Sequence, residues 1–140
     1  MTVDDGIVSD CFVFLLSKAY QKGHQLVQKK LKPYGITNVQ YVVLEMLWEK
    51  EGLTAAELSN HLMIDKATMS GILERMADAD LLIKRQDAKD RRLFRLYPSK
   101  STDKIKSKLI DERKAANEEL LKRFSDSERS TLKRMLIEIL

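Results

Sequence analysis

The feature that most constrains the fold of this chain lies in the middle of the sequence. There, two short helical patterns are followed directly by two strand-like stretches. In TAAELSNHL, Thr54 and Glu57 have the spacing of a capping box, which predicts a helix over residues 54–62. A tight turn follows, and Asp65 is then placed to cap a second helix over residues 66–79. Two short helices joined by about three residues predict a helix-turn-helix.

Each helix of this pair has an apolar face. In the first helix, Leu58 and Leu62 are expected to face inward. The second helix carries apolar residues at i, i+3, i+4 and i+7, and these are Met69, Ile72, Leu73 and Met76. The two helices are therefore expected to pack on a shared core.

A β-hairpin is predicted directly after the second helix. The stretches LLIKR and RRLFRLY read as short strands, and the polar turn QDAKD lies between them. Ile83 and Arg85 alternate on one side, and the other side is covered by Leu93, Phe94, Leu96 and Tyr97. A hairpin at residues 82–97 makes the helix-turn-helix at 54–79 a winged one, within a winged helix-turn-helix region at residues 37–98.

Long helices are predicted on both sides of this region, so the expected fold class is mainly α with a small β-hairpin wing. A helix over residues 9–31 is ended by Pro33 and Gly35. Its first half is apolar on nearly every side, and an intersubunit contact is one explanation. After Pro98 comes a highly charged helix, predicted over residues 102–123.

Two further helices begin with capping boxes. Thr37 and Gln40 begin one of them, and Ser125 and Glu128 begin the last helix of the chain. The first has a predicted stripe of Val39, Val42, Val43, Met46 and Leu47. The last has Leu132, Met135, Leu136 and Ile139 on one face.

The charge of the chain is concentrated in the hairpin. Residues 84–97, KRQDAKDRRLFRLY, contain six basic and two acidic residues, so their net charge of +4 equals the formal surplus of the whole chain. A solvated loop or a salt-bridged turn would also explain such a stretch. An arginine on a narrow ribbon, however, can enter the minor groove of DNA, where the negative potential is enhanced. We therefore expect DNA contacts from Lys89, Arg91 and Arg92.

Two aspartates of the hairpin are expected to give it its structure. Asp87 and Asp90 lie among the basic residues, and an acidic neighbour can fix the geometry of an arginine by a forked ion pair.

The second helix of the pair is expected to enter the major groove by its N-terminal turns. Lys66 can bind a phosphate or a guanine edge, and hydroxyl and small residues after it allow hydrogen bonds and close approach. A helix N-terminus also favours a phosphate. The predicted contacts from this helix are Lys66, Ala67, Thr68, Met69, Ser70 and Arg75. An ordinary amphipathic helix with a polar first turn is the alternative.

These motifs together resemble the MarR family of winged-helix transcription regulators. The family's wing pattern resembles D-x-x-D-R-R, which Asp87, Asp90, Arg91 and Arg92 match within ADLLIKRQDAKDRRLFRLYPS. NVQYVVLEMLWEKEGLTAAELSNHL resembles the family's second and third helices, and RFSDSERSTLKRMLIEIL its last helix. The resemblance covers about residues 10–140.

Three positions depart from the family pattern. Asp80 stands where a glycine usually ends the recognition helix, and Asp tolerates the left-handed conformation needed there. Gly71 stands where a larger, often basic side chain is common, which puts one DNA contact in doubt. Pro98 and Ser99 replace a Leu-Thr pair, which indicates a local change in how the next helix starts.

The resemblance implies a single domain over residues 1–140 and a homodimer formed by residues 9–31 and 102–140. It implies a sequence-specific regulator, generally a repressor, that binds a palindromic operator of double-stranded DNA. Release by a small ligand, often aromatic or phenolic, is also implied. A winged-helix protein-interaction module without specific DNA binding is the alternative from another class.

Cys11 has two interpretations. One branch of the family senses organic hydroperoxides through a cysteine near the start of its first helix, where Cys-Phe begins an apolar stretch as Cys11-Phe12 does here. The other interpretation is a small apolar residue buried in a dimer interface. As the only cysteine, Cys11 forms no intrachain disulfide, which fits a reducing compartment.

Several other functions are not expected. His24 and His61 lie far apart, so no metal site is predicted, and no cofactor motif or nucleophile–base pair indicates an enzyme. The first ten residues are acidic, and the early apolar run from Cys11 to Leu16 is six residues long. Neither a signal peptide nor a membrane span is therefore expected, and we expect a cytoplasmic protein.

Overall fold

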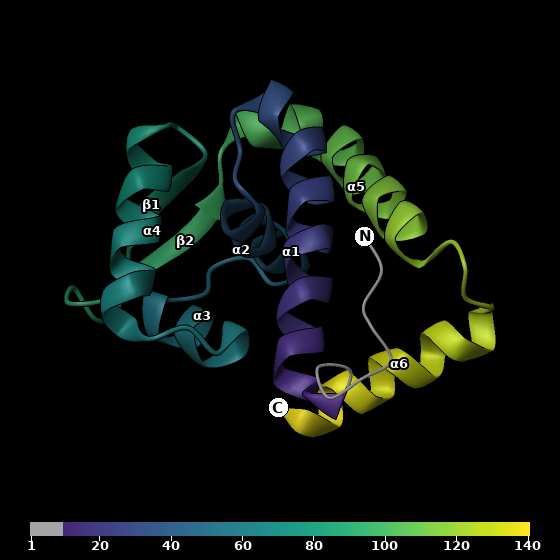
Figure 1. Cartoon of the computed structure of the whole chain (residues 1–140). Helices are drawn as coiled ribbons and strands as arrows, with labels where there is room; N and C mark the ends of the chain where they lie inside the picture. Colours follow the sequence, from purple (N-terminus) through teal and green to yellow (C-terminus); the bar gives the residue numbers. More distant parts are fainter. Residues whose placement is uncertain (1–9) are drawn as a thin grey trace. The chain divides into compact units, whose positions relative to one another are not determined.

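The computed structural model describes residues 10–140 as two compact units, which Figure 1 shows in ribbon form. One unit consists of residues 31–110 and contains the winged helix-turn-helix. The other joins residues 10–30 to residues 111–140. The expected class, mainly α with a two-stranded hairpin, is confirmed.

The first helix, α1, spans Phe12–Leu31. Cys11 precedes it, and its carbonyl accepts the first helical hydrogen bond from the Leu15 N–H at 3.0 Å. The predicted start at Ser9 lies outside the described residues. Pro33 sits in a short 3₁₀ turn, η2 (Lys32–Tyr34), and Gly35 follows with φ 68°. This left-handed residue ends the helical segment as predicted.

The unit of residues 31–110 contains three helices and a hairpin after α1. The helices are α2 (Asn38–Glu49), α3 (Ala55–Leu62) and α4 (Lys66–Asp78). The hairpin consists of β1 (Leu82–Gln86) and β2 (Phe94–Pro98), which pair antiparallel with Leu82 opposite Pro98 and Gln86 opposite Phe94. Helix α3 packs against α4, and α4 lies beside β1.

The core of this unit gathers one apolar face from each element. The predicted stripe of α4 is confirmed, because Met69, Ile72, Leu73 and Met76 are all buried. The stripe predicted for α2 is partly wrong, because Val39 is exposed and Tyr41 and Leu44 are buried instead. Helix α2 is apolar on most sides, so its periodicity does not single out one face.

The hairpin covers the core differently from the prediction. Leu82, Leu96 and Pro98 are buried, whereas Leu93 and Phe94 are exposed. The reason is that strand pairing ends at Gln86 and Phe94, so Leu93 belongs to the loop and Phe94 to the last pair before it.

Side-chain caps fix most helix starts. The capping boxes of Thr37 with Gln40 and of Ser125 with Glu128 are both complete. At α3 only one arm is described, a 3.2 Å bond from the Glu57 N–H to the Thr54 hydroxyl, so the predicted box is a single cap.

The end of α4 is tied to the start of α5 (Lys100–Leu121) by hydroxyl groups. Asp80 has φ 57°, the left-handed conformation expected of it. Its carbonyl accepts hydrogen bonds from the hydroxyls of Ser99 at 2.7 Å and Ser101 at 3.0 Å. The Ser99 hydroxyl also accepts a hydrogen bond from the Thr102 N–H, so α5 starts two residues earlier than predicted.

In the other unit, α1 packs on the C-terminal part of α5. A Cβ at Gly23 would lie 3.1 Å from Leu120 Cδ2, so glycine permits this close approach. The last helix, α6, spans Asp126–Ile139. Arg129 ties it to the end of α5 by donating to the carbonyls of Leu121 and Phe124.

Candidate nucleic-acid interface

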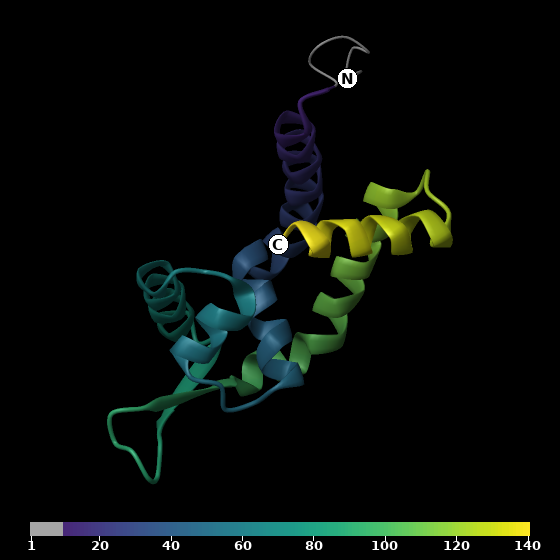
Figure 2. The ribbon, with the colours of Figure 1, turned by 90° about the horizontal axis from the view of Figure 1, so that it is seen from below.

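The loop between β1 and β2 extends as a narrow ribbon away from the helices of its own unit, as Figure 2 shows. Its base is closed by a 2.9 Å bond from the Asp87 N–H to the Leu93 carbonyl. The Gln86 side chain donates to the Arg91 carbonyl at 2.7 Å. These bonds satisfy backbone groups at the tip without any contact to other elements.

Asp87 organises the loop from the inside. Its carboxylate accepts the backbone N–H groups of Lys89 at 3.0 Å and Asp90 at 2.8 Å, and its other oxygen accepts Nε of Arg95 at 2.7 Å. The bond from Arg95, and then the two backbone bonds, lower the pKa of Asp87 below its usual value. Asp87 is therefore ionised at neutral pH.

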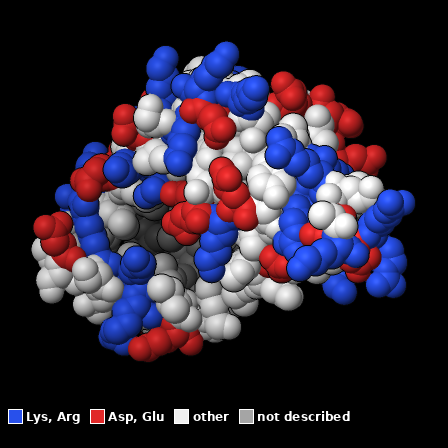
Figure 3. All heavy atoms as spheres, turned by 180° about the vertical axis from the view of Figure 1, so that it is seen from behind, with Lys and Arg blue, Asp and Glu red and all other residues white. Residues whose placement is uncertain are grey.

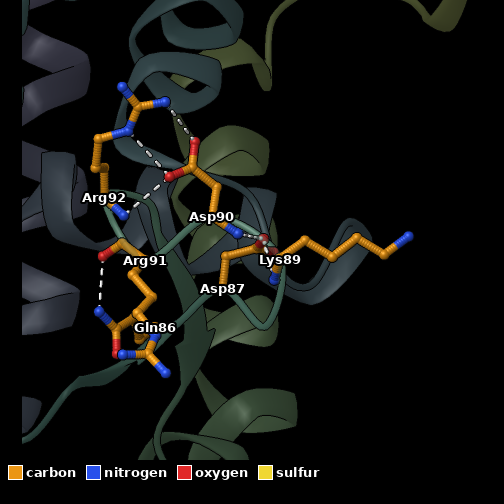
Figure 4. A network of polar contacts seen from close by, with 6 residues as sticks. All are labelled: Gln86, Asp87, Lys89, Asp90, Arg91 and Arg92. Atoms are coloured by element: carbon orange, nitrogen blue, oxygen red, sulfur yellow. Dashed lines mark hydrogen bonds and ion pairs between the residues drawn. The ribbon is translucent and has the colours of Figure 1, made fainter.

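Asp90 holds the exposed arginine of the tip. One oxygen accepts both the Arg92 backbone N–H at 3.0 Å and Arg92 Nε at 3.1 Å, and the other accepts Nη2 at 3.2 Å, as Figure 4 shows. These bonds to Arg92 lower the pKa of Asp90. The Arg92 side chain remains 89% exposed, so the forked pair orients the guanidinium without burying it. Asp87 and Asp90 were predicted to structure the wing, and these are the hydrogen bonds they accept within it.

Lys89 and Arg91 are the other two basic side chains at the tip. Both are exposed, and neither forms an ion pair with any residue from 10 to 140. In Figure 4 the Lys89 side chain extends away from the other labelled residues. Both charges are available to a polyanion.

Arg95 is a structural residue of the wing that the sequence did not single out. Besides Asp87, it donates from Nη1 to the Gly52 carbonyl at 2.9 Å, which fastens the hairpin to the loop between α2 and α3. A signal was available, because Arg85 and Arg95 lie directly opposite each other in the hairpin, where like charges need a neighbour that relieves their repulsion. The Arg85 guanidinium lies over the Tyr97 ring at 5.2 Å.

Helix α4 presents its first turn to solvent. Asp65 caps it by accepting the Thr68 N–H at 2.8 Å and the Thr68 hydroxyl at 2.7 Å. These bonds lower the pKa of Asp65. Five of the six predicted contact residues are exposed, namely Lys66, Ala67, Thr68, Ser70 and Arg75.

Met69 is a correction to the predicted contacts. Its side chain is fully buried beneath α4, because it belongs to the same apolar stripe as Ile72 and Met76. It supports the helix from the core and presents nothing to a groove.

Charge is mixed on one face of the molecule. Figure 3 shows Lys and Arg interspersed with Asp and Glu on the face it draws. A binding function must therefore rest on local arrangements such as the wing tip, because no field of one sign covers that face.

Other candidate sites receive little support. Residues 10–140 contain no group of three or more His, Cys, Asp and Glu side chains arranged to hold a metal ion. His24 stacks against Tyr20, with ring centroids 5.5 Å apart. Cys11 is exposed within its unit. None of the described helices is both long and apolar enough to cross a membrane.

A capped recognition helix, a helix-turn-helix and a basic two-stranded wing define a winged helix-turn-helix protein. The MarR family profile matches residues 36–94, which include α2, α3, α4 and most of the wing. Residues 36–94 therefore contain a MarR-family winged helix-turn-helix, and the relatives of the chain are named as HTH-type transcriptional regulators.

Individual relatives agree with this assignment. The HTH-type transcriptional regulator YsmB of Bacillus subtilis (strain 168) is 27% identical over 119 residues, which are 85% of this chain and 79% of YsmB. The organic hydroperoxide resistance transcriptional regulator of the same strain is 28% identical over 98 residues, 70% of this chain and 67% of that one. Among solved structures, the transcriptional repressor CouR bound to a 23-mer DNA duplex shares the fold with a TM-score of 0.89, at 18% identity and 99% coverage of both chains.

Proposed function

We propose that the chain is a homodimeric regulator that binds double-stranded DNA in a sequence-specific manner and acts as a repressor. The observation that carries this proposal is the wing tip, where Asp90 holds the Arg92 guanidinium in a fixed and exposed orientation. A pre-oriented arginine loses little conformational freedom when it enters a minor groove. A solvated loop would not need such an arrangement.

The proposed binding mode uses both elements of the winged unit. The first turns of α4 enter the major groove, where Lys66, Thr68 and Ser70 can reach bases or phosphates. Arg91 and Arg92 enter the minor groove, and Lys89 binds a backbone phosphate.

The homodimer is supported by apolar surface on the unit of α1 and α6. On α1, Phe12 and Val13 have about three quarters of their surface exposed, at 75% and 78%. At the end of α6, Ile137, Ile139 and the following Leu140 are more than 60% exposed. Apolar residues gathered on the terminal helices indicate a surface that another chain covers. A second copy would pair two recognition helices on a palindrome, with half-sites about one helical turn apart.

We infer repression and release by a small ligand from the resemblance to the family. A dimer on a promoter excludes the transcription machinery, and a ligand that favours a non-binding conformation would release it. The proposed effector is a small aromatic or phenolic molecule, and the proposed location is the cytoplasm, where DNA is accessible.

The test is the double variant Arg91→Ala/Arg92→Ala. We expect it to lower operator affinity by about 1–3 kcal/mol, because it removes the groove-binding cations and leaves the core intact. Fluorescence anisotropy with the duplex upstream of the protein's own gene measures this, beside a scrambled duplex at about 150 mM salt.

The matched control is Lys122→Ala/Arg123→Ala, which removes two exposed adjacent cations elsewhere on the chain. An equal loss in the control, with the dimer intact by light scattering, would mean that only net charge matters. Unchanged affinity of the wing variant would contradict the proposed mode. Equal, weak binding of wild type to both duplexes would favour the protein-interaction module instead.

A redox response through Cys11 is the second candidate. Cys11 is exposed within its unit, and one relative is named as a hydroperoxide resistance regulator. An organic hydroperoxide would oxidise the thiolate to a sulfenic acid and leave as the alcohol. If this candidate is right, stoichiometric hydroperoxide abolishes DNA binding of wild type and not of Cys11→Ser. If both respond alike, Cys11 is not the sensor.

A further inference from the structure

Helix α4 contains a glycine, Gly71, that its backbone does not require. Among the described residues, the glycines with positive φ are Gly35 and Gly52, so Gly71 has ordinary helical geometry. Glycine inside a helix is destabilising relative to alanine, because it loses more conformational freedom on folding. Its presence in the middle of the recognition helix therefore needs a different reason.

The side chain of Arg75 lies over Gly71, in the space that a side chain larger than alanine would enter. A Cβ at Gly71 would lie 3.4 Å from Nη1, 3.8 Å from Nη2 and 3.9 Å from Cζ of Arg75. Side chains four residues apart meet on one face of a helix, and helical side chains lean toward the N-terminus. The guanidinium of Arg75 thus lies at the level of residue 71 and covers the space that a larger side chain would occupy.

The Arg75 guanidinium is also chemically available. Arg75 is exposed, and its side chain forms no ion pair or hydrogen bond within residues 10–140. Its N–H donors are therefore available to a partner from outside the unit.

The neighbouring positions leave this guanidinium room to approach a groove. Ala67, which is exposed, precedes the half-buried Gly71 by four residues on the same side of the helix, so two small residues follow one another along it. Further along the helix, Glu74 and Asp78 are exposed and acidic. Their carboxylates repel phosphates, so the C-terminal half of α4 is not expected to approach the DNA backbone. The part of α4 that fits a groove thus ends near the Arg75 guanidinium.

We propose that Arg75 is the residue of α4 that reads a guanine, with its guanidinium presented over the small residue at position 71. The planar fork of arginine matches O6 and N7 of guanine in the major groove in a fixed geometry, whereas a lysine presents a single flexible ammonium group. This assignment rests on the proposed DNA-binding function and makes it more specific. It separates Arg75 from Lys89, for which a contact with a backbone phosphate is proposed.

The test measures base preference rather than total affinity. Wild type, Arg75→Ala, Arg75→Lys and the control Gly71→Ala are each used to select duplexes from a pool with a randomised central segment. The enriched duplex is then resynthesised with every single base-pair substitution, and each is titrated by fluorescence anisotropy. Thermal unfolding checks that all four proteins are folded.

We expect one G·C pair in each half-site at which wild type prefers guanine by about five- to 150-fold. Arg75→Ala should lose this preference and Arg75→Lys should weaken it, while both keep their preferences at other positions. Gly71→Ala should keep it, because the added Cβ makes only ordinary van der Waals contact with the guanidinium.

Two results would overturn the assignment. Arg75→Ala could keep every base preference of wild type, or it could weaken binding to all duplexes equally with a smaller salt dependence, as loss of a phosphate contact does. If wild type itself shows no preference for any duplex, the proposed function fails and the role of Arg75 fails with it. A specific wild type with unaltered Arg75 variants refutes the assignment alone.

Discussion

Replacing Leu136 and Ile139 together by aspartate is expected to yield a monomer with about 10²- to 10⁴-fold lower affinity for a palindromic duplex. Both residues lie on the predicted apolar face of α6, and they are 39% and 67% exposed within their unit. If a second copy covers them, each aspartate must lose its hydration at an apolar surface, which is strongly unfavourable. A monomer engages one half-site at a time and loses the gain from linked binding.

The control for this variant is Ser127→Asp/Ser130→Asp. It adds the same charge to the same helix, at exposed positions on the opposite side from Leu136 and Ile139. Sedimentation or light scattering reports the oligomeric state, and anisotropy reports DNA affinity. The control should remain a dimer that binds as wild type does. A Leu136→Asp/Ile139→Asp protein that stays dimeric would show that another surface forms the dimer.

The local signals of this sequence predicted most of the fold. Helix starts were predicted well where a side chain can satisfy free N–H groups, as at Thr37, Asp65 and Ser125. The buried stripe of α4 was predicted correctly because its other face is polar. For α2 the pattern failed, since apolar residues surround the helix and only packing decides which of them are buried.

The pairing of aspartates with arginines in the wing could not be predicted from the sequence. Asp87 and Asp90 were predicted as structural residues because acidic residues among arginines suggest ion pairs. Which arginine pairs with which aspartate depends on the loop conformation: Asp90 binds Arg92, whereas Asp87 reaches across the hairpin to Arg95. The bond from Arg95 to the Gly52 carbonyl joins residues 43 positions apart, and no local pattern indicates it.

In the recognition helix, the neighbour of Gly71 likewise could not be predicted from the sequence. From the sequence it appeared to weaken an expected DNA contact. The structure gives it a neighbour four residues later, because the Arg75 guanidinium lies over it. Side-chain direction along a helix, rather than residue type at one position, decides which group a groove would meet.

Leu58→Ala creates a cavity beneath the helix-turn-helix. We expect it to lower the free energy of unfolding by about 2–5 kcal/mol. Leu58 is fully buried in α3, the helix that packs against α4. Truncation removes apolar contacts that close packing does not replace. Urea unfolding at a fixed protein concentration measures the change as a lower midpoint with an unaltered slope, since dimerisation makes stability depend on concentration.

Leu62→Ala is the matched comparison, because it makes the same truncation in the same helix at a half-buried position. Its cost should be clearly smaller, since water already reaches part of the Leu62 side chain and less apolar surface is lost from the core. If both variants lost the same free energy of unfolding, the difference in burial between Leu58 and Leu62 would be contradicted. The Leu58→Ala protein that remains folded should still select the wild-type duplex, because the groove-facing residues of α4 are unaltered.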